Sequence, residues 1–174
     1  ALVALDGPGD DQADAHVAAL LTALAQSTLT EPHPLVTALK ANADRTSLDR
    51  FGWRLFELWL GEGAPPREKW AMFAVGLFGS DVSALKLTPL IRRWPGESQH
   101  QRAVLGLECL RAIGTDTALM QINGIAQKVP FKAIKARAGE CIEAIAADLG
   151  LTRAQLEDRI VPDCDLDERG SRVF

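Results

Sequence analysis

The sequence predicts an all-α fold, and three observations lead to this prediction. Ala and Leu dominate the composition while Tyr is absent, which disfavours strands. Apolar residues recur at the helical spacing i, i+3, i+4, i+7 along the whole chain, and the alternation typical of strands does not persist anywhere. The helical pattern also repeats at an interval of about 35 residues.

Composition and charge exclude several classes of protein. A chain of 174 residues is long enough for one domain that buries roughly 70% of its unfolded surface. No apolar run approaches the ~20 residues that span a bilayer, and the net charge of −4 does not favour nucleic acid or anionic membranes as partners of the whole molecule. The first residues lack both a secretory leader and an initiator Met, so both ends are expected to be cuts inside a longer polypeptide.

The three cysteines show no metal-binding or redox spacing. Cys109 and Cys141 fall at core positions of predicted helices, and Cys164 lies near the C-terminus. An odd number of cysteines without a CxxC pair is typical of small buried side chains in a reducing compartment. We therefore expect a cytoplasmic protein without disulfides.

An internal repeat organises the central part of the chain. Gly79, Gly114 and Gly150 are separated by 35 and 36 residues, and a run of apolar positions precedes each of them. The spacing of those positions places them on one face of a helix. They are Ala71, Ala74, Val75 and Phe78; Gly106, Cys109, Leu110 and Ile113; and Ile142, Ile145, Ala146 and Leu149.

Each repeat is expected to be a helix, a tight turn and a second helix. The glycine suits a helix C-terminus because it adopts positive φ without strain. A short polar stretch follows it and can cap the next helix, and each second helix has an apolar residue at the equivalent position. The polar stretches are Ser80-Asp81, Thr115-Asp116 and Thr152, and the apolar residues are Leu85, Met120 and Leu156. A single hairpin cannot bury its apolar face alone, so neighbouring hairpins are expected to stack.

This two-helix unit resembles the repeats of HEAT and armadillo α-solenoids. The resemblance implies an α-α superhelix of HEAT-like helical hairpins. Residues 67–160 are expected to form the regular repeats, residues 1–66 looser repeats of the same solenoid, and residues 161–174 an acidic connector towards a downstream domain. The early helices are predicted at Asp11–Gln26, Pro34–Ala43, Leu48–Leu60 and Arg67–Phe78.

One segment of the early part has two interpretations, and the helix before it carries a predicted apolar face. Residues 61–66, Gly-Glu-Gly-Ala-Pro-Pro, are either a plain interhelical loop or a hinge. The predicted helix before them carries Phe51, Leu55, Leu58 and Trp59 on one face. Trp53, Trp59 and Trp70 fall at apolar helical positions, where we expect core residues.

The last third of the chain carries a narrower resemblance. Leu156–Asp163 reads Leu-Glu-Asp-Arg-Ile-Val-Pro-Asp, and it follows Ile125–Lys128 and precedes Leu166–Val173. These blocks resemble the region upstream of the conserved domain in large bacterial proteins of the "molybdate metabolism regulator-like" family. The resemblance implies that this chain is the helical-repeat segment of a longer protein whose next domain begins near Phe174. The residues themselves contain no set of molybdate ligands.

No constellation of residues indicates catalysis or metal binding. His16, His33 and His100 are isolated, and HExxH, GxSxG, P-loop and GxGxxG patterns do not occur. Residues 163–167 begin like a calcium loop, but Glu168 stands where such a loop needs Gly and Phe174 where it needs a bidentate carboxylate. We therefore expect no enzyme activity, no metal and no cofactor.

Basic residues are expected along the outward line of the second helices. Superposing the repeats aligns Arg93 with Lys128 and places Lys86, Gln121 and Arg153 on the same line. This ridge would follow the concave side of a solenoid and could extend through Lys132, Lys135 and Arg137. Basic groups beside an aromatic residue are typical of phosphate contact with base stacking, whereas the alternative is an ordinary polar helix face. The candidate binding residues are Lys86, Arg93, Trp94, Gln121, Lys128, Lys132 and Arg153.

Three functions are compatible with these observations. The first is a non-catalytic scaffold that mediates protein–protein or interdomain interaction within a larger bacterial protein. The second is a nucleic-acid-binding module that uses the basic ridge on the concave side, against which the acidic net charge counts. A third possibility is that the full-length protein is an enzyme whose catalytic domain this segment positions.

Overall fold

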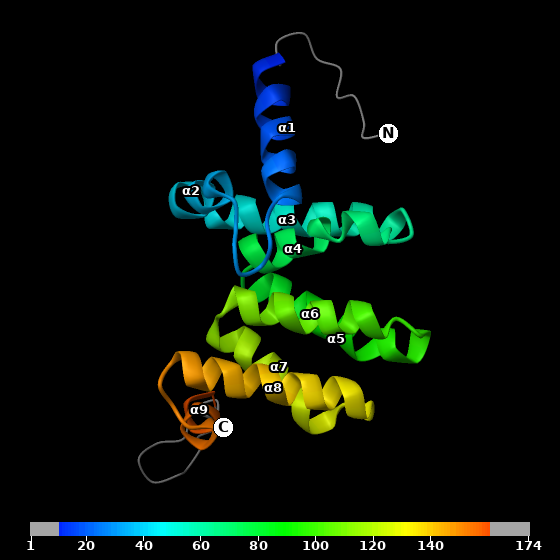
Figure 1. Cartoon of the computed structure of the whole chain (residues 1–174), viewed down its shortest axis with the longest axis vertical. Coiled ribbons are helices and arrows are strands. Elements are labelled where there is room, and N and C mark those ends of the chain that lie inside the picture. Colours follow the sequence, from blue (N-terminus) through cyan, green and yellow to red (C-terminus); the bar gives the residue numbers. More distant parts are fainter. Residues whose placement is uncertain (1–10, 161–174) are drawn as a thin grey trace, which may run out of the picture. The chain divides into compact units, whose positions relative to one another are not determined.

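The computed structural model describes residues 11–160, and all regular structure in that range is helical (Figure 1). This confirms the all-α prediction. The expectations for residues 161–174, including the acidic connector and the calcium-loop pattern, lie outside the described residues. The helices are α1 (Asp11–Ala25), α2 (Pro34–Asn42), α3 (Arg45–Gly61), η1 (Pro66–Glu68), α4 (Trp70–Phe78), α5 (Asp81–Arg93), η2 (Trp94–Glu97), α6 (His100–Ile113), α7 (Asp116–Lys128), α8 (Lys132–Asp148) and α9 (Arg153–Ile160).

The chain divides into two compact units, Ala1–Ser83 and Ala84–Phe174. The division falls within the first turn of α5. The boundary expected from the sequence, at residue 66, lies inside the first unit at the start of η1.

In the first unit α3 packs along α4, and α1 and α2 also contact α4. The core contains Leu24, Val36 and Leu55, which are 8% exposed or less. Gly52 allows the close approach of α3 to α4, because a Cβ at this position would lie 2.8 Å from the carbonyl oxygen of Ala74. The absence of a side chain at Gly52 is therefore a requirement of this packing.

The glycine- and proline-rich segment after α3 is an interhelical loop. The indole Nε1 of Trp59 donates a hydrogen bond to the carbonyl oxygen of Pro65 at 3.0 Å, and the amide of Ala64 donates to the carbonyl oxygen of Trp59 at 2.8 Å. Gly63 and Ala64 both adopt positive φ, which turns the chain back towards α4. These bonds hold the loop against the end of α3.

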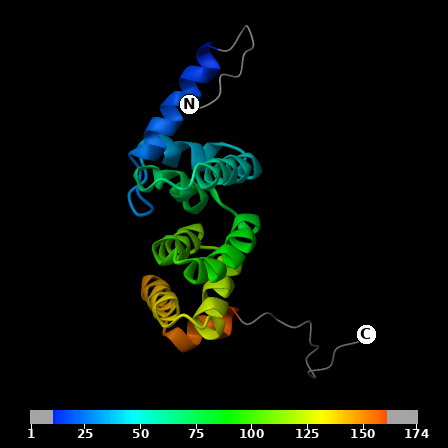
Figure 2. The same ribbon diagram turned by 90° about the vertical axis from the view of Figure 1, so that its right-hand side faces the viewer.

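In the second unit α6 packs against α7 and α8, and α9 packs against α7 and α8. Consecutive helices are antiparallel, so α6 and α8 lie side by side in one layer while α7 and α9 form the other (Figure 2). The core includes Leu107, Leu110, Ile122, Ile134 and Ile142, each fully buried. The helix, turn, helix order expected from the repeat is present at Gly114 and Gly150.

The repeat's glycines do not share one conformation. Gly114 and Gly150 both adopt a φ of +67°, as expected for helix ends. Gly79 has a φ of −63° and a ψ of 153°, so the prediction of a left-handed glycine is wrong there. The chain leaves α4 in an extended conformation instead, and the hydroxyl of Ser80 accepts a hydrogen bond from the amide of Val82 at 3.2 Å.

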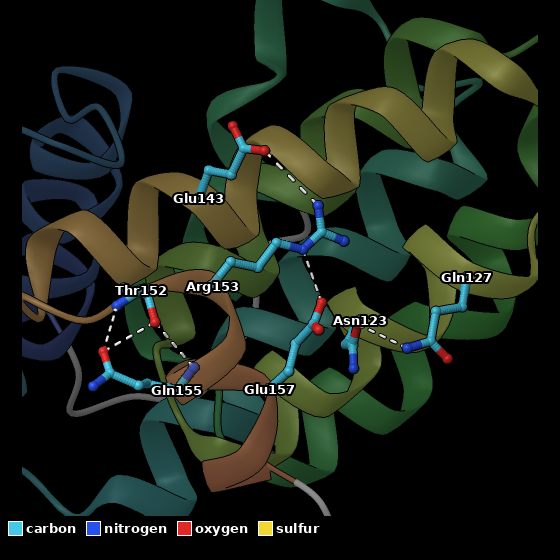
Figure 3. Close-up of polar contacts among 7 residues, drawn as sticks. All are labelled: Asn123, Gln127, Glu143, Thr152, Arg153, Gln155 and Glu157. Carbon is cyan, nitrogen blue, oxygen red and sulfur yellow. Dashed lines mark hydrogen bonds and ion pairs between the residues drawn. The ribbon is translucent and has the colours of Figure 1, made fainter.

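The polar residues after the glycines cap the helices that follow. Thr115 Oγ1 accepts a hydrogen bond from the amide of Ala118. Thr152 and Gln155 form a reciprocal capping box, in which the amide of Thr152 donates to Gln155 Oε1 at 2.8 Å and the amide of Gln155 donates to Thr152 Oγ1 at 3.3 Å (Figure 3). The predicted capping role is confirmed at both turns.

The column predicted for the second helices was one residue out of register. Leu85 is 53% exposed and Met120 is half-buried, whereas Leu156 is fully buried. Leu151 is an extra residue between Gly150 and the capping Thr152, so counting from the glycines misplaces the two earlier helices. Counting four residues on from Ser80, Thr115 and Thr152 instead gives a column that is buried throughout, made of Ala84, Leu119 and Leu156.

The apolar faces of the first helices are mostly as predicted. Ala71, Ala74, Val75 and Phe78 are all buried, and so are Gly106, Cys109, Leu110, Ile142 and Ala146. Ile113 and Ile145 are half-buried, and Leu149 is 51% exposed because it follows the end of α8. Among the tryptophans expected in the core, Trp59 is buried, whereas Trp53 and Trp70 are half-buried, and Leu58 on the predicted face of α3 is 38% exposed.

Candidate interaction surfaces

Two interhelical connections of the second unit meet at the same end of its layers. They are the α5–α6 connection, which contains η2, and the short α7–α8 connection (right-hand side of Figure 1). The ring of Phe131 holds them together. A Cβ at Gly96 would lie 3.7 Å from Phe131 Cζ, and the ring of His100 meets the ring of Phe131 edge-on with 6.3 Å between centroids.

This end of the unit carries a concentration of positive charge. Residues 92–102 and 127–135 contain six basic side chains against one carboxylate, that of Glu97, for a formal net charge of +5 with His neutral. The whole chain has a net charge of −4. We call this surface the basic edge, and it consists of Arg92, Arg93, Arg102, Lys128, Lys132 and Lys135.

Contacts with neighbouring groups position several members of the basic edge. The Arg102 guanidinium lies over the Trp94 ring, 5.8 Å from its centroid. Lys135 Nζ donates to the carbonyl oxygen of Gln127 at 3.4 Å, near the negative end of the α7 dipole. A Cβ at Gly124 would lie 3.2 Å from an Arg92 nitrogen, so Arg92 reaches across to α7. These contacts link α6 to η2, α8 to α7 and α5 to α7 within the basic edge.

A separate ion-pair network lies further along α6 and α8. Arg137 bonds to Glu108 of α6 and to Glu140 of its own helix. Hydrogen bonds to Glu140 and Glu108 raise the pKa of Arg137 further above its usual range. Burial raises the pKa of the neighbouring Cys141 thiol to about 11, and the Glu108 carboxylate contributes to the shift. The carboxylates of Glu108 and Glu140 thus balance the positive charge of Arg137, and Arg137 does not extend the basic edge.

The structure separates the sequence-predicted binding residues into two groups. Lys86, Arg93, Lys128 and Lys132 are exposed, and Gln121 is half-buried. Trp94 is only 1% exposed, so it is a core residue and does not offer a stacking surface. Arg153 lies between two carboxylates, with Nε 2.8 Å from Glu157 Oε1 and Nη1 3.8 Å from Glu143 Oε1 (Figure 3).

These pairs take Arg153 out of the predicted ridge. Its hydrogen bond to Glu157 raises the pKa of Arg153, so its charge is permanent but locally balanced. Sequence reasoning also missed Arg102. It joins the edge because α6 begins directly after η2 and places the Arg102 guanidinium over the Trp94 ring. The excess of basic residues within 92–102 and 127–135 was a signal that could have found the edge.

A cleft of about 270 Å³ lies at the opposite end of the second unit. Its apolar walls come from Leu110, Leu119, Ile122, Ile145 and Leu156, and Leu149 stands at its rim. An ion pair crosses the same end, since Arg111 Nη2 lies 2.9 Å from Asp148 Oδ2. The cleft can accommodate one or two apolar side chains.

The first unit has an apolar groove of its own, between α1 and α2. The groove measures about 370 Å³ and is lined by His16, Val17, Ala19, Leu20, Leu35 and Leu39. Val17 is 48% exposed and Leu35 is 37% exposed. Five of the six lining residues are apolar, so this is a surface that water solvates poorly.

Chemistry-bearing groups are dispersed in the part of the chain that the structure describes. Within residues 11–160, His, Cys, Asp and Glu side chains form no cluster of three or more that could hold a metal ion. Cys109 and Cys141 are buried and form no disulfide, as expected. His33 Nδ1 accepts a hydrogen bond from the amide of Leu35 and caps α2. No described helix combines the length and apolar character needed to cross a membrane.

Comparison with known proteins finds one informative relative. The chain is 37% identical to the uncharacterised protein YehI of Escherichia coli (strain K12) over 136 residues, which is 78% of this chain. The match spans only 11% of the length of YehI. No protein-family model matches the chain. No solved structure matches it either.

Proposed function

We propose that this chain is a non-catalytic segment of a HEAT-type α-solenoid that binds a protein partner or a neighbouring part of its own polypeptide in the cytoplasm. The consecutive antiparallel helices in two layers of the second unit support this reading, because that is how helical repeats pack. The relation to a much longer bacterial protein supports a role within a larger assembly of domains. The resemblance to the molybdate metabolism regulator-like family remains a prediction.

The observation that carries the proposal is the apolar groove between α1 and α2. Val17 and Leu35 are partly exposed on the two facing helices, and Leu20 and Leu39 line the same groove. An apolar groove between two helices can receive the apolar face of a third, amphipathic helix. Val17 and Leu35 are already about half buried, so burying the rest of each side chain contributes roughly 0.5–1.5 kcal/mol to association.

The groove also agrees with how repeat proteins are organised. Each helical hairpin of a solenoid buries its remaining apolar face against the next hairpin, and only terminal repeats have polar outer faces. The α1–α2 face has no such polar character. We therefore propose that its partner is an amphipathic helix that presents apolar residues at i, i+3, i+4 and i+7.

Capture from a bacterial lysate, with and without nuclease, tests the proposal. The full 174-residue chain is compared with a variant that carries Val17→Asp and Leu35→Asp, which places two charges in the groove. A protein that the native chain captures in both conditions and that the double variant does not capture is the expected result, since buried unpaired charges are costly.

A matched control separates the groove from general loss of surface hydrophobicity. Leu58→Asp changes another exposed leucine, 38% exposed, on α3, and should leave capture unchanged. Material that is recovered equally by the groove variant, or that disappears on nuclease treatment, would count against the scaffold function.

A further inference from the structure

The basic edge concentrates positive charge in a chain that is acidic overall. The basic edge has a formal charge of +5, while the chain as a whole has −4. A surface that differs so strongly in sign from the rest of the molecule attracts and orients a polyanion. We propose that the basic edge binds the phosphate backbone of double-stranded nucleic acid without sequence preference.

The side chains at the centre of the edge are available for contact. Lys128 and Lys132 are exposed on either side of the α7–α8 connection, and neither forms an ion pair with a described residue. Glu97, the one carboxylate of the edge, is engaged by Arg93 Nε at 2.9 Å. Lysine and arginine groups held on a rigid surface gain affinity for phosphates through the counterions that they release.

The edge lacks the features of a protein-binding surface. Protein interfaces depend on buried aromatic or aliphatic anchors at their centre. Among the described residues, large apolar side chains that are exposed all lie outside 92–102 and 127–135, namely at Val17, Leu35, Leu58, Val82, Leu85 and Leu149. A partner at the basic edge is therefore recognised by charge, which favours a phosphate backbone over an acidic protein segment.

The aromatic residues of the edge favour a duplex over a single strand. Single-stranded nucleic acid binds where its bases can stack on exposed aromatic rings. Trp94 is 1% exposed and Phe131 is half-buried against His100. Trp94 has no open face and Phe131 packs against His100, so the edge offers chiefly charged groups that bind a phosphate backbone. Such contacts are the non-specific component of duplex binding.

This inference does not depend on the α1–α2 groove, which belongs to the other compact unit. It also differs from the ridge expected along the second helices. The ridge required Arg153 and an exposed Trp94, whereas the basic edge uses Arg92 and Arg102 and includes Lys135, which was expected only as an extension of the ridge. Experiments on the α1–α2 groove and on the basic edge can therefore succeed or fail independently.

The test is fluorescence anisotropy of the full chain with a labelled 20-base-pair DNA duplex of arbitrary sequence, in 50 mM and 200 mM salt. The edge variant carries Lys128→Glu and Lys132→Glu. The control carries Arg45→Glu and Arg67→Glu, which changes the net charge equally at exposed positions of the first unit. Far-UV circular dichroism checks that both variants are folded.

We expect the native chain to bind the duplex at 50 mM salt and to lose affinity steeply at 200 mM. The edge variant should bind at least about tenfold more weakly, and the slope of log K against log salt should fall by about 2, one for each lost phosphate contact. The control should bind within about twofold of the native chain.

Absence of duplex binding at 50 mM salt, or equal weakening in both variants, would overturn the proposal. A 20-residue poly-glutamate peptide that displaces the duplex at lower charge concentration than unlabelled duplex would overturn it in favour of an acidic protein partner.

Discussion

The Asp49 carboxylate accepts a hydrogen bond from the backbone amide of Ser80, with 2.6 Å between Oδ1 and the amide nitrogen. The two residues are 31 positions apart and join the second turn of α3 to the turn between α4 and α5. Asp49 is 6% exposed, so its carboxylate is largely removed from water. This bond therefore satisfies a buried acceptor and holds the chain where α4 ends.

Loss of the Asp49 carboxylate should destabilise the chain. In Asp49→Ala the Ser80 amide loses its acceptor, and hydrogen bonds to charged groups contribute about 1.5–3 kcal/mol. Asp49→Asn keeps an oxygen at the same place and should cost less. Urea unfolding followed by circular dichroism measures both variants, and an unchanged midpoint for Asp49→Ala would show that the bond contributes nothing.

Leu110 and Leu149 both belong to the apolar faces predicted for the first helices of the repeats, but they differ in burial. Leu110 lies in α6 and is fully buried, whereas Leu149 is 51% exposed. Leu110→Asp should therefore cost several kcal/mol, because an unpaired charge enters the core. Leu149→Asp should change stability by no more than about 0.5 kcal/mol. Thermal unfolding distinguishes the two, and equal effects would contradict the packing described for α6 and α8.

Two glycines inside helices should respond in opposite directions to the same substitution. A Cβ at Gly106 would lie 2.5 Å from Ile91 Cγ1 and 3.3 Å from the Trp94 ring, while a Cβ at Gly139 would meet nothing within 4 Å. Gly106→Ala should destabilise by about 1–3 kcal/mol through overpacking. Gly139→Ala should stabilise by about 0.5–1 kcal/mol, since alanine favours the helix. Denaturant midpoints measure both, and stabilisation by Gly106→Ala would show that α5 and α6 are not in close contact there.

Cys141 should be protected from alkylation in the folded chain. Its pKa is raised from 9.0 to about 11, so at pH 9 roughly 1% of the folded thiol is ionised. The variant with Cys109→Ala and Cys164→Ala leaves one thiol. Iodoacetamide should modify it at least about 50-fold more slowly in the native chain than in urea at pH 9, because half of an ordinary thiol is ionised there.

The same shift has a consequence for stability against pH. The folded thiol holds its proton more tightly than the unfolded thiol, so its contribution is fully present below pH 9 and is lost between pH 9 and pH 11. Replacing Cys141 with Ala should remove this part of the alkaline decline. A variant with the same alkaline decline as the native chain would contradict the assigned cause.

Helical periodicity was enough to place most helices, because it is a local property of the sequence. The predicted Asp11–Gln26 and Pro34–Ala43 correspond closely to α1 and α2. The register of the second helices could not be read from the glycines, since Leu151 adds one residue before the capping Thr152. Capping geometry sets where a helix begins, and only the structure shows which residue acts as the cap.

The candidate binding surface was predicted only in part. Exposure of Lys86, Arg93, Lys128 and Lys132 agrees with their placement on polar helix faces. Burial of Trp94 depends on α6, which packs against η2, and the pairing of Arg153 with Glu143 joins α9 to α8. The pattern within one helix contains no information about such neighbours, whereas the pair of Arg153 with Glu157 has i, i+4 spacing within α9 and could have been expected from the sequence.

By itself the sequence determined the all-α class, the tight turns at Gly114 and Gly150, and the burial of the apolar faces before them, because each follows from contacts within a few residues along a helix. Tertiary structure alone decided that Leu85 is exposed while Ala84 is buried, and that basic side chains from four helices gather at one edge. Those outcomes depend on which helices lie side by side, and that is set by packing between residues far apart in the chain.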